Sequence, residues 1–89
     1  MVRYQLSITG RVQGVGFRYT ANAIAQKYRL TGYVKNEYDG SVLVEVQGDE
    51  AALDQFIQEV SAGRFIRIDR IERERIPVEE DERGFIVQY

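Results

Sequence analysis

The chain has 89 residues, of which 44% are hydrophobic and 11% aromatic, a composition typical of one folded domain with a modest core. It contains no cysteine and no histidine, which excludes disulfides, thiolate chemistry and the commonest general base and metal ligand. A net charge of −2, from 12 basic and 14 acidic residues, argues against a broad nucleic-acid surface. We therefore predict a single domain over residues 1–89 without a nucleic-acid partner.

The hydrophobic residues are dispersed along the chain. No apolar run approaches the ~20 residues of a membrane span. The first residues, Met1-Val2-Arg3-Tyr4, contain no apolar signal region. We expect no membrane partner and a cytoplasmic location.

The first third of the chain combines a strand pattern with a helix pattern. Apolar and polar residues alternate over Tyr4–Thr9, which predicts a strand with one buried face. Apolar residues at helical spacing then predict an amphipathic helix from Phe17 to near Leu30, with Gly32 just beyond its end. A glycine-rich turn separates the two elements.

The middle of the chain predicts a hairpin followed by a helix. Strands are expected at Tyr33–Glu37 and Ser41–Gln47, joined by a turn at Asp39-Gly40. A second amphipathic helix is expected to follow, with Asp49 as its N-cap and Gly63 beyond its end.

The last third of the chain is less regular. The isoleucines change parity between Ile68 and Ile71, which predicts a bulge or a late strand start within one strand at Ile68–Ile76. The acidic run Glu79–Glu82 predicts a solvated loop, and Phe85–Tyr89 a short final strand.

This order of elements is β-α-β-β-α-β with an extra C-terminal strand. It predicts an α+β, ferredoxin-like fold, with two helices on one face of a mainly antiparallel sheet. In this topology the first and second strands run parallel with the third between them, so their C-terminal ends lie at one edge, roughly 10 Å apart. Asn36, at the end of the second strand, should face the glycine-rich turn across a gap that would fit a phosphate and one water.

The glycine-rich turn has the features of an anion site. It reads Gly10-Arg11-Val12-Gln13-Gly14-Val15-Gly16-Phe17-Arg18. Glycine permits close approach of the backbone to a ligand, and no polar side chain caps the helix, so its first N–H groups are available to an anion. Arg18 adds a full charge and a planar fork that suits two phosphate oxygens. The alternative is an ordinary glycine turn with a solvated arginine.

Two segments resemble the signatures of the acylphosphatase family. Residues 8–18 are similar to the first signature, and Gly32-Tyr33-Val34-Lys35-Asn36, followed by Gly40, Val42 and Gly48, is similar to the second. The resemblance implies hydrolysis of the mixed anhydride of an acyl phosphate to a carboxylate and inorganic phosphate. It also implies no metal, no other cofactor and no covalent phosphoenzyme.

The resemblance further implies a role for each site residue. Arg18 would bind the phosphate, and Asn36 would orient the attacking water. The backbone that cradles the phosphate would come from Gln13, Gly14, Val15, Gly16, Phe17 and Arg18. A carboxylate leaving group, with a pKa near ~4, needs little general-acid help, which agrees with the absence of histidine. The alternative for Asn36 is that it satisfies local backbone at a strand end. Tyr19 and Thr20 lie in the first helical turn and could line the pocket, but we expect them to pack within that turn.

Three other functions fit the same order of elements. RNA-binding modules stack bases on aromatic residues of the first and third strands, but the third strand here, residues 41–47, has none. Similar domains begin the hydrogenase-maturation carbamoyltransferases, where they act on carbamoyl phosphate, whereas the single domain expected here favours a freestanding enzyme. A sensor that binds phosphate without turnover is the third possibility. We expect a monomeric enzyme whose only partners are a small acyl phosphate and inorganic phosphate.

Overall fold

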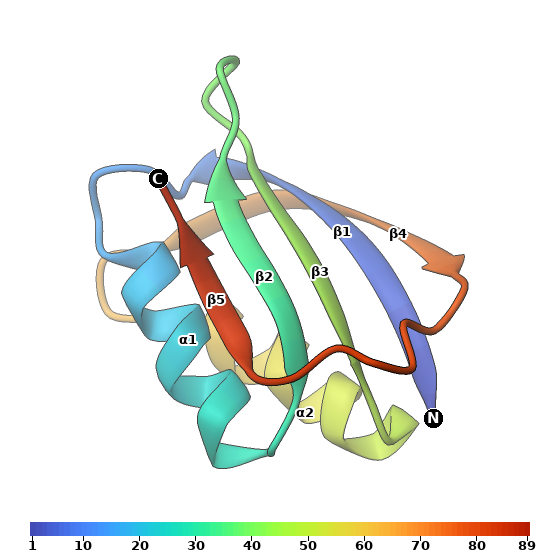
Figure 1. Cartoon of the computed structure of the whole chain (residues 1–89). Coiled ribbons are helices and arrows are strands. Elements are labelled where there is room, and N and C mark those ends of the chain that lie inside the picture. The colour runs from blue at the N-terminus through green and yellow to red at the C-terminus, as the bar shows by residue number, and fades with distance from the viewer.

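The computed structural model describes all 89 residues and shows a five-stranded sheet with two helices on one face (Figure 1). The elements are β1 (Val2–Arg11), α1 (Phe17–Lys27), β2 (Thr31–Asn36), β3 (Val42–Gly48), α2 (Glu50–Ser61), β4 (Arg67–Ile76) and β5 (Phe85–Gln88). The strand order is β4-β1-β3-β2-β5, antiparallel except for the β2/β5 pair. The predicted ferredoxin-like fold is confirmed. Neither helix has the length and apolar character needed to cross a bilayer.

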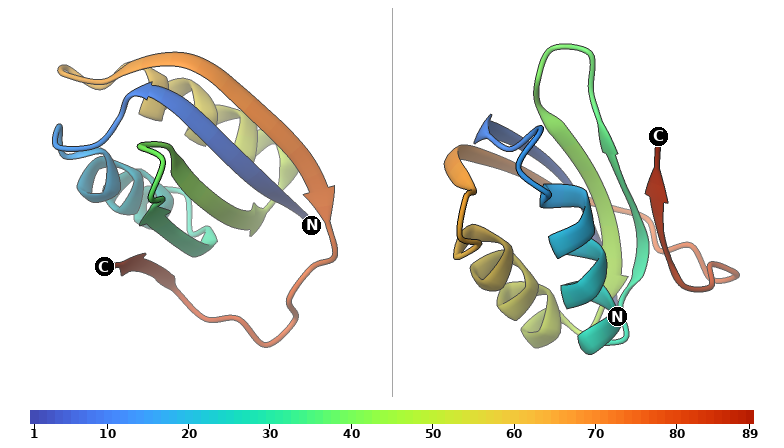
Figure 2. Two further views of the ribbon diagram at one scale, coloured as in Figure 1. Left: turned by 90° about the horizontal axis from the view of Figure 1, so that it is seen from above. Right: turned by 90° about the vertical axis from the view of Figure 1, so that its left-hand side faces the viewer.

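The hydrophobic core lies between the sheet and the helices (Figure 2). Alternate residues of the two central strands face the helices, and Leu6 of β1 and Val44 of β3 are completely buried. From the helices, Ala21 of α1 and Phe56 of α2 meet them, also without exposed surface. The alternation that predicts the strands is therefore the pattern that fills the core.

The helix boundaries differ in detail from the sequence prediction. The helix α1 ends at Lys27 instead of near Leu30, because Arg29 adopts a left-handed φ of 56° and the N–H groups that follow Lys27 bond back into the last turn. Gly32 consequently lies inside β2. Asp49 occupies the N-cap position of α2, but its carboxylate makes no capping hydrogen bond.

The change of parity among the isoleucines is explained by a β-bulge. The register of β4 against β1 shifts at Gly10, so that Asp69 has no partner. This shift lets Ile68 and Ile71 both pack against the core. Gly10 has a φ of 135°, and a Cβ there would lie 2.2 Å from the carbonyl oxygen of Arg67. Glycine at this position therefore allows the two strands to approach at the bulge.

The segment between β4 and β5 crosses the sheet on the face opposite the helices (Figure 1). Arg3 is only 2% exposed and donates to Glu45 at 3.0 Å and to Glu82 at 2.7 Å. Gln47 and Glu79 exchange two further hydrogen bonds, of 2.8 and 2.9 Å. The prediction of a solvated acidic loop is therefore wrong for Glu82, which is half-buried against Arg3, and holds for the two residues before it, which are exposed.

The carboxylate of Glu45 accepts several hydrogen bonds on the face of the sheet opposite the helices. Tyr33 donates to it at 2.8 Å and Gln5 at 3.2 Å, in addition to Arg3. Burial by itself raises the pKa of Glu45, but the hydrogen bonds from Tyr33, Arg3 and Gln5 together hold the pKa below its ordinary value of 4.5. Burial and the same carboxylate raise the pKa of Tyr33 to about 12.

The fold should therefore be acid-sensitive through Glu45. A carboxyl group whose pKa is lower in the folded state than in the unfolded state stabilises the protein at pH values above its unfolded-state pKa of 4.5. This stabilisation is lost as the pH falls through the folded-state pKa. We predict that Glu45→Gln lowers the free energy of unfolding at neutral pH. The free energy of unfolding of this variant should also decrease less between neutral and acid pH than that of the wild type. Urea titration at several pH values would measure both effects. Glu80→Gln, at an exposed position, should keep the wild-type decline. An unaltered acid slope in Glu45→Gln would contradict this account.

Candidate active site

Apolar side chains fix the turn between β1 and α1 from the core side. Val12 and Phe17 are each 1% exposed, and Val15 also packs against the core. These three apolar side chains anchor the turn to the core at its start, middle and end.

The backbone of this turn presents a set of unbonded donors. Gly16 is the N-cap of α1, with a φ of 78° and no side-chain cap. The N–H groups of residues 13–19 donate to no acceptor in the protein, and the first bonded one is that of Thr20, which donates to the Gly16 carbonyl at 2.9 Å. Such a row of N–H groups at the positive end of a helix is a site for an anion.

Arg18 projects from the first turn of α1 and is held by the C-terminal strand. Its Nη1 donates to the carbonyl of Gln88 at 2.8 Å, and its Cζ lies 4.7 Å from the centre of the Tyr89 ring. A guanidinium group has five N–H donors, so most of them stay available to a ligand. The contacts with β5 orient the group without neutralising its charge.

Asn36 is the last residue of β2 and lies level with β1 across the sheet. Asn36 and Ile8 of β1 are both paired with Val42 of β3, so they are separated by two strand spacings, about 10 Å. The Oδ1 atom of Asn36 is buried and has no hydrogen-bond partner. The carboxamide oxygen thus does not satisfy local backbone. A buried acceptor without a partner is rare and is expected to meet a ligand or water.

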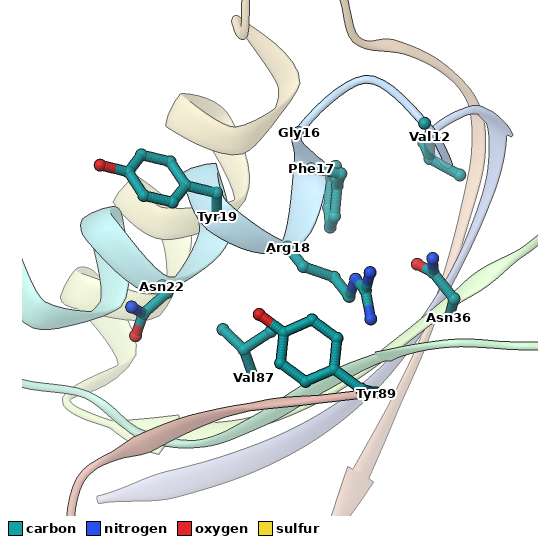
Figure 3. A pocket seen from close by; sticks show the side chains of 10 residues that line it. Val12, Gly16, Phe17, Arg18, Tyr19, Asn22, Asn36, Val87 and Tyr89 are labelled. Carbon is teal, nitrogen blue, oxygen red and sulfur yellow. The ribbon is translucent and has the colours of Figure 1, made fainter.

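A cavity of about 470 Å³ brings these groups together (Figure 3). Of the predicted site residues, Gly14, Gly16, Phe17, Arg18 and Asn36 line it. The Arg18 guanidinium points toward the Asn36 carboxamide. None of the lining residues is acidic, and nowhere in the structure do three or more potential metal-ligating side chains form a group that could hold a metal ion. The side chains that line the cavity are therefore neutral or positive, as binding of an anion requires.

Five further residues line the cavity without being predicted site residues: Val12, Tyr19, Asn22, Val87 and Tyr89. Tyr19 lines the cavity and is 80% exposed, so the interpretation that it packs in the first turn is wrong. Asn22 lies one helical turn after Arg18, a spacing that could have indicated it. Val87 and Tyr89 reach the cavity because β5 pairs with β2, and no periodicity in the sequence predicts that pairing.

The side chain of Gln13 connects the turn to the hairpin that carries Asn36. Its Nε2 donates to the carbonyls of Glu37 and Ser41, both at 2.8 Å. Glu37 follows Asn36 directly, and its own N–H donates to the Ser41 carbonyl at 2.8 Å. Both amide hydrogens of Gln13 are thereby used, so only its backbone N–H is left for an anion.

The family model and the similar curated proteins name the same family. The family model described as Acylphosphatase matches residues 4–87. The acylphosphatase of Clostridium acetobutylicum is 43% identical over 90 aligned residues, which span 100% of this chain and 99% of that protein. The acylphosphatase of Geobacillus kaustophilus is 46% identical over 100% of this chain and 96% of that protein.

Solved structures give the same result. The crystal structure of acylphosphatase from Bacillus subtilis has a TM-score of 0.93 and 38% sequence identity, with 100% of both chains covered. HypF of T. kodakarensis contains a similar region, with a TM-score of 0.86 and 37% identity, but the match spans only 12% of that chain.

The bridge made by Gln13 should stabilise the site. Gln13→Met keeps the length of the side chain but removes both donated hydrogen bonds, and should lower the free energy of unfolding by about 1–3 kcal/mol. Urea unfolding would measure the loss, and hydrogen exchange of the Glu37 amide should become faster. Gln58→Met, at an exposed position of α2 without a hydrogen bond, is the matched control. Equal stability of the two variants would rule out the bridge.

Proposed function

The chain belongs to the acylphosphatase family and is a hydrolase acting on acyl phosphates, and we propose that the cavity at the start of α1 is its active site. Arg18 and the backbone N–H groups of residues 13–18 hold the phosphoryl group, and Asn36 orients the attacking water. The observation that carries this proposal is that unbonded N–H donors, one guanidinium group and one unpartnered carboxamide oxygen surround the same cavity.

The phosphoryl group is bound by complementary charge. Its oxygens accept hydrogen bonds from the fixed N–H groups of the turn, where the helix dipole adds partial positive charge. Arg18 supplies the full positive charge and two parallel donors. In phosphoryl transfer the equatorial oxygens carry charge through the transition state, so donors fixed in advance lower the barrier.

Asn36 positions the water on the side of the phosphorus that faces β2. Its Oδ1 accepts one hydrogen of the water, which directs a lone pair of the water oxygen toward phosphorus. The new P–O bond forms as the bond from phosphorus to the acyl oxygen breaks, and the carboxylate leaves with the electron pair. Both hydrogens of the water end on the phosphate, so that an acyl phosphate dianion and water give a carboxylate and dihydrogen phosphate.

The leaving group explains how a site without histidine suffices. A carboxylic acid has a pKa near ~4, so the leaving oxygen needs no proton from a general acid at neutral pH. In a loose transition state the water also needs little activation before attack. Positioning and electrostatic stabilisation then carry the reaction, which we propose to proceed without a metal or another cofactor.

We further propose that residues 1–89 act as one domain and as a monomer. Every group that the proposed mechanism uses is supplied by one chain. The cytoplasmic location expected from the sequence stays a prediction.

Substitutions of the two proposed catalytic residues should have different effects. Asn36→Ala removes only the acceptor for water, so turnover of benzoyl phosphate should fall by about 10²-fold or more while inhibition by inorganic phosphate changes little. Arg18→Ala should lose both turnover and phosphate binding, because the guanidinium acts in the ground state and the transition state. Arg11→Ala, at an exposed arginine outside the cavity, is the matched control. Unchanged turnover in Asn36→Ala would remove this residue from the mechanism.

Removal of metal ions should leave the activity intact. Release of inorganic phosphate from benzoyl phosphate should proceed at the same rate before and after dialysis against EDTA, because the proposed steps use only side-chain and backbone donors. A loss of activity on chelation that added divalent metal restores would refute the metal-free mechanism.

A further inference from the structure

The guanidinium of Arg18 is oriented by the last residues of the chain. Arg18 makes one hydrogen bond within the protein, from Nη1 to the carbonyl of Gln88 at 2.8 Å, and its Cζ lies 4.7 Å from the centre of the Tyr89 ring (Figure 3). A long arginine side chain has many rotamers, so this hydrogen bond selects the one that points into the cavity. The position of the Gln88 carbonyl therefore decides where the positive charge of the cavity lies.

The strand β5, which carries this carbonyl, has few contacts of its own. It has four residues, it pairs on one side only, with β2, and it ends beside the fully exposed Tyr89. The last residues of a chain are poorly ordered unless a contact ties them down. Phe85 anchors the first residue of β5 in the core, and residues 77–84 bring the chain to that point. The placement of β5 therefore depends on how this preceding segment is held.

One side chain of residues 77–84 bonds to the sheet, and it belongs to Glu82. Its two carboxylate oxygens accept hydrogen bonds of 2.7 and 3.1 Å from Nη1 and Nη2 of the buried Arg3. Such a two-point contact between a guanidinium and a carboxylate is strong and fixes direction as well as distance. Glu82 lies three residues before Phe85, so this ion pair holds the chain close to the start of β5.

We propose that Glu82 is a positioning residue for Arg18. By binding Arg3 it fixes the start of β5, and β5 in turn places the Gln88 carbonyl that orients the guanidinium. Glu82 does not line the cavity, and its segment crosses the sheet on the face opposite the helices (Figure 1), so its effect on the reaction passes through Arg18. The inference rests on the proposed function, in which Arg18 binds the phosphoryl group.

Removal of the Glu82 carboxylate tests this role. Glu82→Ala leaves Arg3 paired with Glu45 at 3.0 Å, so the variant should fold. The KM for benzoyl phosphate and the inhibition constant for inorganic phosphate should rise together, by about two- to thirtyfold, because both depend on Arg18. The Nε–H group of Arg18 should also become more mobile, measured by nitrogen-15 NMR relaxation. Glu82→Gln keeps the length of the side chain and one acceptor oxygen, so it should show the same changes to a smaller extent.

The matched control is Glu80→Ala, at an exposed position of the same segment, which should leave all three quantities at their wild-type values. If Glu82→Ala and Glu82→Gln change only the free energy of unfolding, while Arg18→Ala still loses phosphate binding, the positioning role is wrong and the proposed function stands. If Glu82→Ala does not fold, the same measurements on Glu82→Gln decide. If Arg18→Ala keeps both turnover and phosphate binding, the proposed function fails and the positioning role fails with it.

Discussion

The site depends on the alignment of two parallel strands on either side of β3. Ile8 of β1 and Asn36 of β2 are paired with the same residue, Val42, so the turn that leaves β1 and the carboxamide that ends β2 lie at one edge of the sheet. A slip of one residue in either register would turn every buried valine of β3 toward the polar face. The hydrophobic core therefore fixes the separation between the proposed anion-binding turn and Asn36.

Several polar groups at this edge of the sheet have no hydrogen-bond partner in the protein. The N–H groups of residues 13–19 have no acceptor in the protein, and Oδ1 of Asn36 is a buried acceptor without a donor. A buried polar atom left unpaired costs about 1–3 kcal/mol. The core side chains Val12 and Phe17 stabilise the turn despite this cost. In the proposed function, the unpaired donors and acceptor are complementary to a phosphoryl group and a water, so substrate would satisfy what the fold leaves open.

A polar network far from the cavity supports the arginine within it. The buried Arg3 binds Glu82, and Gln47 binds the backbone of Glu79, so the segment after β4 is held across the sheet. That segment carries β5 to the edge of β2, where the carbonyl of Gln88 accepts a hydrogen bond from Arg18. The orientation of the guanidinium thus depends on contacts made on the opposite face of the sheet from the helices.

The sequence by itself determined the order of the elements, the glycine-rich turn and the choice of Arg18 and Asn36 as site candidates. Alternation, helical spacing and the absence of a cap are local properties, because they are expressed within a few residues. The choice of Asn36 also required the expected strand topology and the resemblance to the family. The parity change at Ile71 was also visible, but its origin as a bulge depends on the partner strand, β1. Only the tertiary structure decided that Gln13 bridges to Glu37 and that Arg18 meets Gln88, contacts between residues 24 and 70 positions apart. The pattern of a sequence records which residues are buried, whereas the packing of distant segments decides which of them meet.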